Sequence, residues 1–137
     1  MGRALALIAA ATVAHVVIAG LVPLAPQEAY YWEYARHLSL SYYDHPPLVA
    51  WTIRGAMALF GESERAIRSA AAFHSALFAI FLFLAARRLF TERVAMLTLA
   101  LGLLTPLFAL SQTVITPDAP LLSGWAATFY FLIRALQ

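Results

Sequence analysis

Long stretches of apolar residues, each close to the length that crosses a lipid bilayer, constrain this chain more than any other feature. Helices of roughly 20 residues are needed to cross a hydrocarbon core of about 30 Å. Only 12% of the residues are charged, against roughly 25% in soluble domains. We therefore expect an all-α polytopic membrane protein with about four transmembrane helices, at residues 4–24, 69–86, 94–111 and 121–136.

The segment between the first two of these spans, residues 25–68, differs from them in being polar and aromatic. The spacing of its tyrosines predicts a helix over residues 28–38 with an aromatic face, which suits a membrane interface. A second helix is expected over residues 48–60, between a proline and Gly61. This helix is too short to cross the bilayer and carries Arg54, so we expect it to lie at the membrane interface as well.

Arginine placement predicts the orientation of the chain. Arg87, Arg88 and Arg93 surround one short connection, which the positive-inside rule assigns to the cytoplasm. Both termini are then expected in the cytoplasm, and residues 25–68 and the turn at Asp118 outside it. The net charge of +2 is too small and scattered for nucleic acid, and cysteine is absent, so thiolate chemistry is excluded.

The acidic residues on the outer side are the candidates for chemistry. Glu28 lies beside Tyr30, where a carboxylate could bind sugar hydroxyls or act as an acid or base, although helix capping is an alternative. Asp44 and Asp118 each lie within two residues of a proline. Each of them is either part of a turn or an acid that the turn places at a substrate. Arg54 either contacts lipid headgroups or binds a phosphate, and the same choice applies to Arg68.

Several motifs occur in an order that resembles the N-terminal part of bacterial membrane glycosyltransferases. The family includes protein O-mannosyltransferases and lipid A aminoarabinose transferases. The resemblance covers residues 26–136, and rests on Glu28-Ala-Tyr-Tyr-Trp, Tyr42-Tyr-Asp-His-Pro-Pro-Leu-Val-Ala-Trp, Leu59-Phe-Gly, Arg68, Ala86-Arg-Arg-Leu-Phe and Thr116-Pro-Asp-Ala-Pro-Leu.

This resemblance implies sugar transfer from a polyprenyl-phosphate donor to a lipid, protein or glycan, at the outer face of a bacterial plasma membrane. The family's catalytic Asp-Glu pair falls on Gln27 and Glu28 here. Because Gln cannot accept a proton as a base at neutral pH, either Glu28 takes over, the acceptor differs, or the chain is inactive. The implied catalytic residues are Glu28, Asp44 and Asp118, and the implied substrate-binding residues are Gln27, Tyr30, Tyr31, Tyr43, His45, Arg54 and Arg68.

Two features of the reaction stay open at the level of sequence. Asp44 and Asp118 are candidate ligands of a divalent cation, whereas an arginine could neutralise the leaving phosphate without one. Family members are longer, so we expect a fragment of the enzyme. The competing classes are a non-catalytic membrane interaction module and a small four-span transporter, although a transporter should carry an acid within a span and these spans have none.

Overall fold

The regular secondary structure of the described residues is all α-helical, as the long apolar stretches predict. The computed structural model describes the backbone of residues 1–137 and the side chains of all of them except Leu107, Leu110, Ser111 and Gln112. The described residues contain no strand. The helices are α1 (Gly2–Ala19), α2 (Pro26–Arg36), α3 (Leu48–Phe60), α4 (Glu64–Leu89), α5 (Glu92–Leu104), α6 (Pro106–Thr113) and α7 (Asp118–Leu136).

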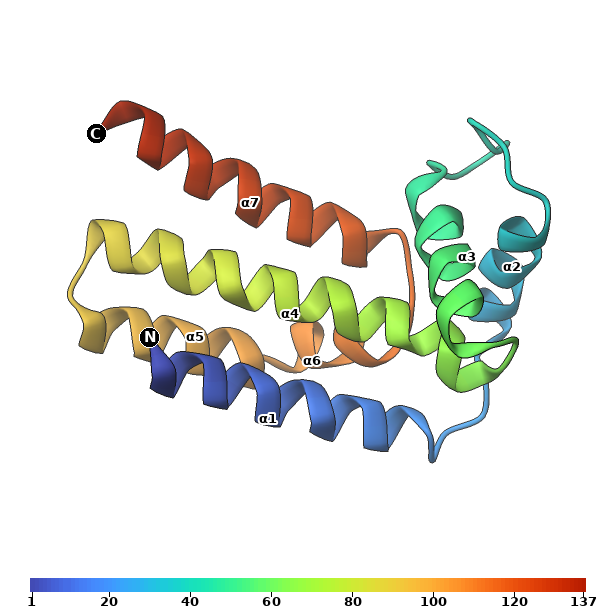
Figure 1. Cartoon of the computed structure of the whole chain (residues 1–137), viewed down its shortest axis with the longest axis horizontal. Helices are drawn as coiled ribbons and strands as arrows, with labels where there is room; N and C mark the ends of the chain where they lie inside the picture. Colours follow the sequence, from blue (N-terminus) through green and yellow to red (C-terminus); the bar gives the residue numbers. More distant parts are fainter.

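The helix α4 forms the centre of a bundle whose long helices run along the longest axis of the molecule (Figure 1). It contacts α1, α3, α5, α6 and α7, and most of its buried residues are alanines between Ala66 and Ala86. Small side chains let helix backbones approach closely where the hydrophobic effect does not drive association. Three helices, α1, α4 and α7, are long and apolar enough to cross a membrane.

The predicted span at residues 94–111 is two helices instead of one. α5 ends at Leu104, and α6 begins at Pro106. Thr105 adopts an extended conformation with φ of −65° and ψ of 121°, as expected for a residue whose helical geometry would collide with the following proline ring. The sequence predicts a kink at Pro106, and the structure has a full break.

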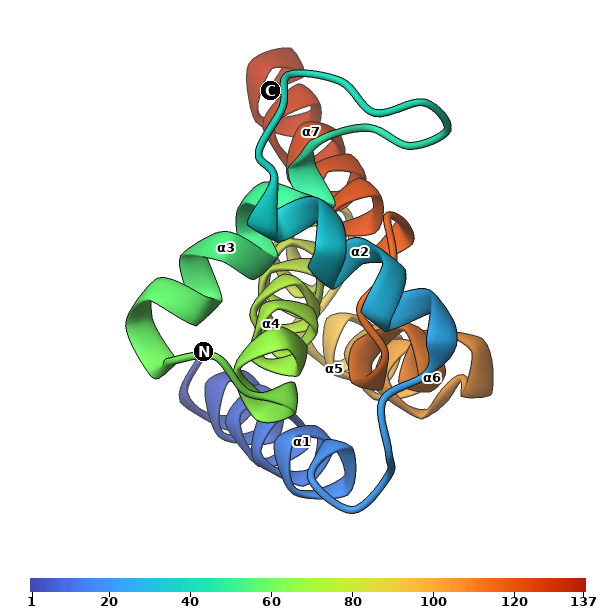
Figure 2. The same ribbon diagram turned by 90° about the vertical axis from the view of Figure 1, so that its right-hand side faces the viewer.

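The interfacial helices α2 and α3 lie across one end of the bundle (Figures 1 and 2). Tyr31 of α2 and Ile53 of α3 share a buried core with Ile67 of α4 and Ile115 of the connection between α6 and α7. Gly61 ends α3 at a φ of +79° that favours glycine, as predicted. The Ser63 hydroxyl accepts a bond from the Ala66 amide at 3.2 Å, which caps α4.

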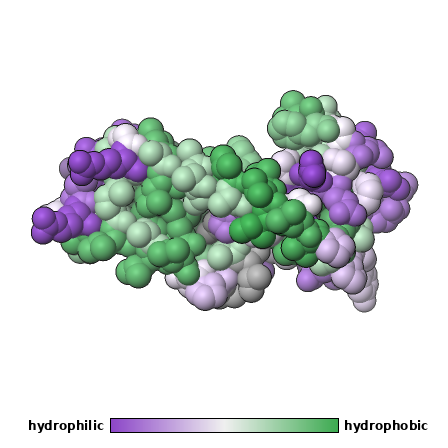
Figure 3. Space-filling model, turned by 90° about the horizontal axis from the view of Figure 1, so that it is seen from below, coloured by the Kyte–Doolittle hydropathy of each residue, from purple (hydrophilic) through white to green (hydrophobic). Residues whose placement is uncertain are grey.

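The surface divides into a broad apolar zone and two polar ends (Figure 3). One end carries α2, α3 and their connection, and the other carries both termini and the connection between α4 and α5 (Figure 1). Large apolar side chains such as Val13, Val17, Leu101 and Phe129 are exposed along the bundle. This distribution fits a helical protein surrounded by lipid over its middle section.

Candidate functional site

Two tyrosines of α2 hold the Asp44 carboxylate at the surface of the polar end. The Tyr34 hydroxyl lies 2.7 Å from Oδ1, and the Tyr30 hydroxyl lies 3.1 and 3.0 Å from Oδ1 and Oδ2. The two tyrosines are neighbours on one helical face, with ring centroids 4.6 Å apart and their hydroxyls in contact. The Asp44 side chain remains 42% exposed, so a substrate can reach it.

These hydrogen bonds change the acidity of both partners. Donation from Tyr34 is the main cause that lowers the pKa of Asp44, with a further contribution from Tyr30, and partial burial opposes it. The pKa of the Tyr34 hydroxyl is raised by its bonds to Tyr30 and Asp44. Asp44 is therefore a stable carboxylate at neutral pH, and Tyr34 stays a hydrogen-bond donor.

A second chain of contacts joins Gln27, Tyr31 and His45. Gln27 Nε2 donates to the Tyr31 hydroxyl at 3.2 Å, and that hydroxyl lies 3.3 Å from His45 Nε2. His45 Nε2 lies 3.6 Å from Asp44 Oδ2. Burial is the largest cause that raises the pKa of Tyr31, with smaller contributions from the charges of Asp44 and Asp118. Tyr31 therefore lies within the electrostatic reach of both carboxylates.

The connection that carries Asp44 is fixed to α2 by a stacked ring. The Tyr42 ring lies parallel to that of Tyr34 with centroids 4.0 Å apart, and its hydroxyl donates to the carbonyls of Tyr34 and His37 at 2.9 and 3.0 Å. Sequence reasoning named neither Tyr34 nor Tyr42 as a site residue. The spacing of Tyr30 and Tyr34 on one helical face was the available signal for the first, and the motif that begins at Tyr42 was the available signal for the second.

Glu28 has different surroundings from Asp44, because it is fully buried and paired with an arginine. Arg68 Nε lies 3.0 and 3.2 Å from its oxygens, and Arg68 Nη2 lies 2.7 Å from Oε2. The Arg68 side chain is 2% exposed, and the Glu28 side chain is 0% exposed. Each carboxylate oxygen also accepts a backbone N–H, from Ala25 to Oε2 at 3.0 Å and from Ile115 to Oε1 at 3.2 Å.

The guanidinium group of Arg68 is also fully hydrogen-bonded. Its Nη1 donates to the carbonyls of Ala19 and Val22, and its Nη2 donates to the carbonyl of Pro23 at 2.9 Å. Together with the bonds to Glu28, these contacts use every N–H group of the guanidinium. In this structure the pair joins α1, α2, α4 and the connection before α7, and neither partner has a free hydrogen-bonding position for a substrate.

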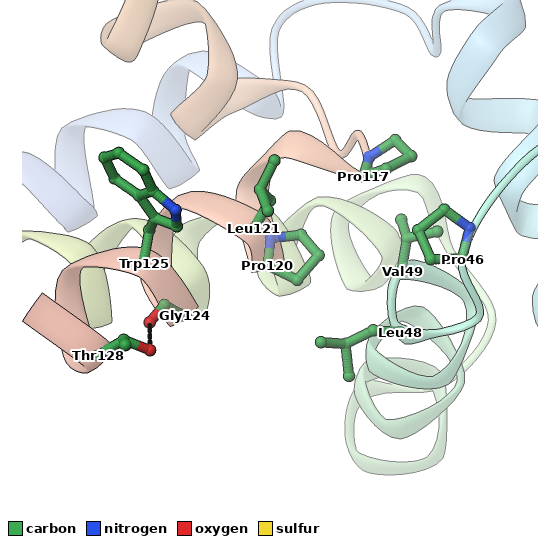
Figure 4. Close-up of a pocket in the computed structure, with 9 residues that line it drawn as sticks. All are labelled: Pro46, Leu48, Val49, Pro117, Pro120, Leu121, Gly124, Trp125 and Thr128. Carbon is green, nitrogen blue, oxygen red and sulfur yellow. Dashed lines mark hydrogen bonds between the residues drawn. The ribbon is translucent and has the colours of Figure 1, made fainter.

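An apolar groove lies between the start of α3 and the start of α7, with a volume of about 350 Å³ (Figure 4). Two of its lining residues are close in sequence to the exposed acids. Pro46 lies two residues after Asp44, and Pro117 directly precedes Asp118. Gly124 leaves open space where a side chain would stand. The lining residues are Pro46, Leu48, Val49, Pro117, Pro120, Leu121, Gly124, Trp125 and Thr128.

The remaining predicted site residues do not join this cluster. Tyr43 is fully exposed, and Arg54 is exposed on α3 without an ion pair to any residue that the structure describes. Among those residues, no group of three His, Cys, Asp or Glu side chains converges as metal ligands do. The idea of a cation between Asp44 and Asp118 stays a prediction.

The fold and this polar end define a polytopic membrane protein with an exposed carboxylate, Asp44, and an apolar groove that begins two residues further along the chain. A family model described as dolichyl-phosphate-mannose-protein mannosyltransferase matches residues 44–137. This match covers more than half of the chain, so the chain belongs to that family of membrane glycosyltransferases. It includes Asp44 and Asp118 and begins after Glu28. Neither the curated proteins nor the solved structures contain a significant match.

Proposed function

We propose that this chain forms the donor-binding face of a glycosyltransferase that moves a sugar from a polyprenyl phosphate to an acceptor outside the cytoplasm of a bacterial cell. One observation carries the proposal. In a member of this family, an exposed and ionised carboxylate, Asp44, lies two residues before Pro46, which lines an apolar groove. A lipid-linked sugar needs both an apolar path for its chain and polar groups at its head.

The groove suits the isoprenoid part of such a donor. Its wall combines prolines with Leu48, Leu121 and Trp125, which offer apolar contact but few hydrogen-bonding groups. A polyprenyl chain that lies there would place its phosphate and sugar near Asp44 and Asp118. Because both of these groups are acidic, we assign them to the sugar and the acceptor and not to the phosphate.

The transfer step exchanges one bond at the anomeric carbon of the sugar. An acceptor oxygen attacks this carbon, the bond to the phosphate oxygen breaks, and the phosphate leaves on the lipid. The acceptor proton passes to a carboxylate, for which Asp44 is the first candidate and Asp118 the second. Ordered tyrosine hydroxyls at Asp44 hold its oxygens in place before the substrate arrives.

Glu28 and Arg68 have a positioning role in this proposal. Their ion pair holds the backbone at Ile115, three residues before Asp118, against the start of α2. It thereby fixes the distance between the two exposed acids. Acting as a base would require Glu28 to give up a buried charged partner, which is energetically costly.

A non-catalytic interaction module is the second candidate function, and Gln27 favours it. This residue takes the place of a family carboxylate, and its amide donates to the Tyr31 hydroxyl. The cluster would then bind a lipid-linked sugar without transferring it. Binding of the donor without turnover, in a preparation that retains its helical content, would support this second function over the first.

The groove offers a test that leaves the rest of the fold unchanged. In Gly124→Leu the new side chain would enter open space within the groove, and Gly55→Leu is a matched control on α3, also open and outside the groove. We expect Gly124→Leu to reduce binding of undecaprenyl phosphate mannose at least about tenfold, measured by the change in tryptophan fluorescence of the protein on titration with this lipid. Equal binding by both variants would contradict the proposed donor path.

A further inference from the structure

The end of the bundle that lies opposite Asp44 is strongly cationic. It carries five of the nine arginines but only one of the seven acidic residues, Glu92. The Glu92 carboxylate lies 3.5 Å from the N-terminal ammonium group. The arginines of this end have no ion pair among the residues whose side chains are described, and they are Arg3, Arg87, Arg88, Arg93 and Arg134.

Two of these arginines line a cavity of about 320 Å³ between α4 and α7, together with Leu84 and Tyr130. α7 diverges from α4 toward this end of the bundle (Figures 1 and 2). The Tyr130 ring remains packed near Phe81 of α4, with centroids 5.8 Å apart. The cavity thus has cationic groups from Arg87 and Arg88, a phenol on one wall and an apolar floor.

We propose that this cavity binds the headgroup of an anionic phospholipid of the phosphatidylglycerol type. Guanidinium groups form charge-assisted bonds with phosphate oxygens, and a tyrosine at the membrane interface can donate to the same headgroup. Leu84 lines the cavity one turn before Arg87 and Arg88 on α4, on the side of the apolar zone where acyl chains lie. The 53% exposed Phe131 packs beside Tyr130 and adds apolar surface near the cavity. The site is distinct from the groove near Asp44, and the proposal does not depend on sugar transfer.

The alternative account needs no bound lipid. Arg87 and Arg88 occupy the last turn of α4, where cations interact favourably with the helix carbonyls and extend toward water. In that case the headgroup attraction would depend on net charge alone, and any two arginines of this end would contribute equally. A site with defined geometry predicts that Arg87 and Arg88 contribute much more than the others.

The experiment compares two double variants that lose the same charge. The whole chain is purified in detergent, mixed with dioleoylphosphatidylglycerol or dioleoylphosphatidylcholine, and analysed by native mass spectrometry. We expect Arg87→Gln/Arg88→Gln to lower retention of phosphatidylglycerol about tenfold, because charge-assisted bonds are lost. Arg93→Gln/Arg134→Gln, whose residues do not line the cavity, should stay within about twofold of the parent chain.

Three results would overturn the proposal. Equal losses in the two double variants would indicate attraction by net charge, and equal retention of phosphatidylcholine would show that the anionic headgroup is not recognised. Displacement of phosphatidylglycerol by millimolar inorganic phosphate would identify free phosphate as the ligand. Tyr130→Phe provides a milder change, with an expected loss of about threefold, and circular dichroism checks that each variant keeps its helices.

Discussion

Glu28 and Asp44 are carboxylates of the same segment between α1 and α4, yet their surroundings are opposite. Glu28 is completely buried, and it accepts hydrogen bonds from an arginine and from two backbone amides. Asp44 is 42% exposed, and its donors are neutral tyrosine hydroxyls. The difference shows that a short distance in sequence does not give acids the same role.

The hydrogen-bond donors differ between the two acids, and this explains why only Asp44 presents its negative charge to a ligand. The guanidinium of Arg68 neutralises Glu28, so the buried pair has no net charge and no free acceptor position. The hydroxyls of Tyr30 and Tyr34 orient Asp44 without removing its charge. The charges of Asp44 and Asp118 both raise the pKa of Tyr31. The first arrangement holds elements together, whereas the second presents negative charge to a ligand.

The largest effect should come from removing the arginine of the buried pair. Arg68→Met leaves the Glu28 carboxylate buried without its charged partner, which costs about 3–5 kcal/mol in the free energy of unfolding. Denaturant titration in detergent, followed by circular dichroism, measures the change. Arg65→Met is the matched control, because Arg65 is exposed on the same helix, and it should change stability by less than about 0.5 kcal/mol. Similar values for the two variants would contradict the structural role of the pair.

A double-mutant cycle should reveal the coupling between the partners. Glu28→Gln/Arg68→Met removes both charges, so its loss of stability should be smaller than the sum of the two single losses. The expected difference is about 1–3 kcal/mol, as for residues in direct contact. Strictly additive losses in the same denaturant titration would mean that the two side chains do not interact.

The smallest effect concerns the acidity of Asp44. Tyr34→Phe removes the main donor that lowers the pKa of Asp44, so this pKa should rise toward its usual value. In the parent chain, folding favours the ionised form of Asp44. The stability that this form contributes is lost only as the pH falls through the lowered pKa of Asp44. NMR titration of the Asp44 carboxyl carbon measures the shift.

The control for this titration is Tyr43→Phe, which changes a fully exposed tyrosine next to Asp44 in the chain. It should leave the titration of Asp44 unchanged. If Tyr43→Phe moved the pKa of Asp44 as far as Tyr34→Phe does, the specific bond from Tyr34 would not be the cause.

The spacing of side chains and the residues that begin or end helices predicted much of the fold. The helix predicted at residues 48–60 has those bounds in the structure, and the tyrosine face of residues 28–38 corresponds to α2 (Pro26–Arg36). Both follow from local rules, since prolines and Gly61 limit the helices and 3.6-residue spacing defines their faces. The break at Thr105 was underestimated, because a local pattern indicates that Pro106 disturbs a helix but not by how much.

The sequence predicted that some candidate site residues lie close together, but it did not predict most of their contacts. It placed the candidate chemistry between residues 26 and 47, and Tyr30, Asp44 and His45 are in contact there. It did not indicate that Arg68 pairs with Glu28, forty positions away. Such a contact depends on how α4 crosses the ends of α1 and α2, and no periodic pattern encodes that crossing. The position of Arg68 directly before the apolar stretch of residues 69–86 was the available signal.

The most direct test of this account compares sugar transfer by Asp44→Asn and Glu28→Gln, each expressed per folded molecule. With a polyprenyl phosphate sugar as donor, Asp44→Asn should lose at least about 100-fold in rate with only a small loss of stability, because a contacting carboxylate is removed from an exposed position. Glu28→Gln should lose stability but keep its rate per folded molecule within a few fold. A folded Asp44→Asn that retains full transfer, beside a folded Glu28→Gln that has none, would contradict the account.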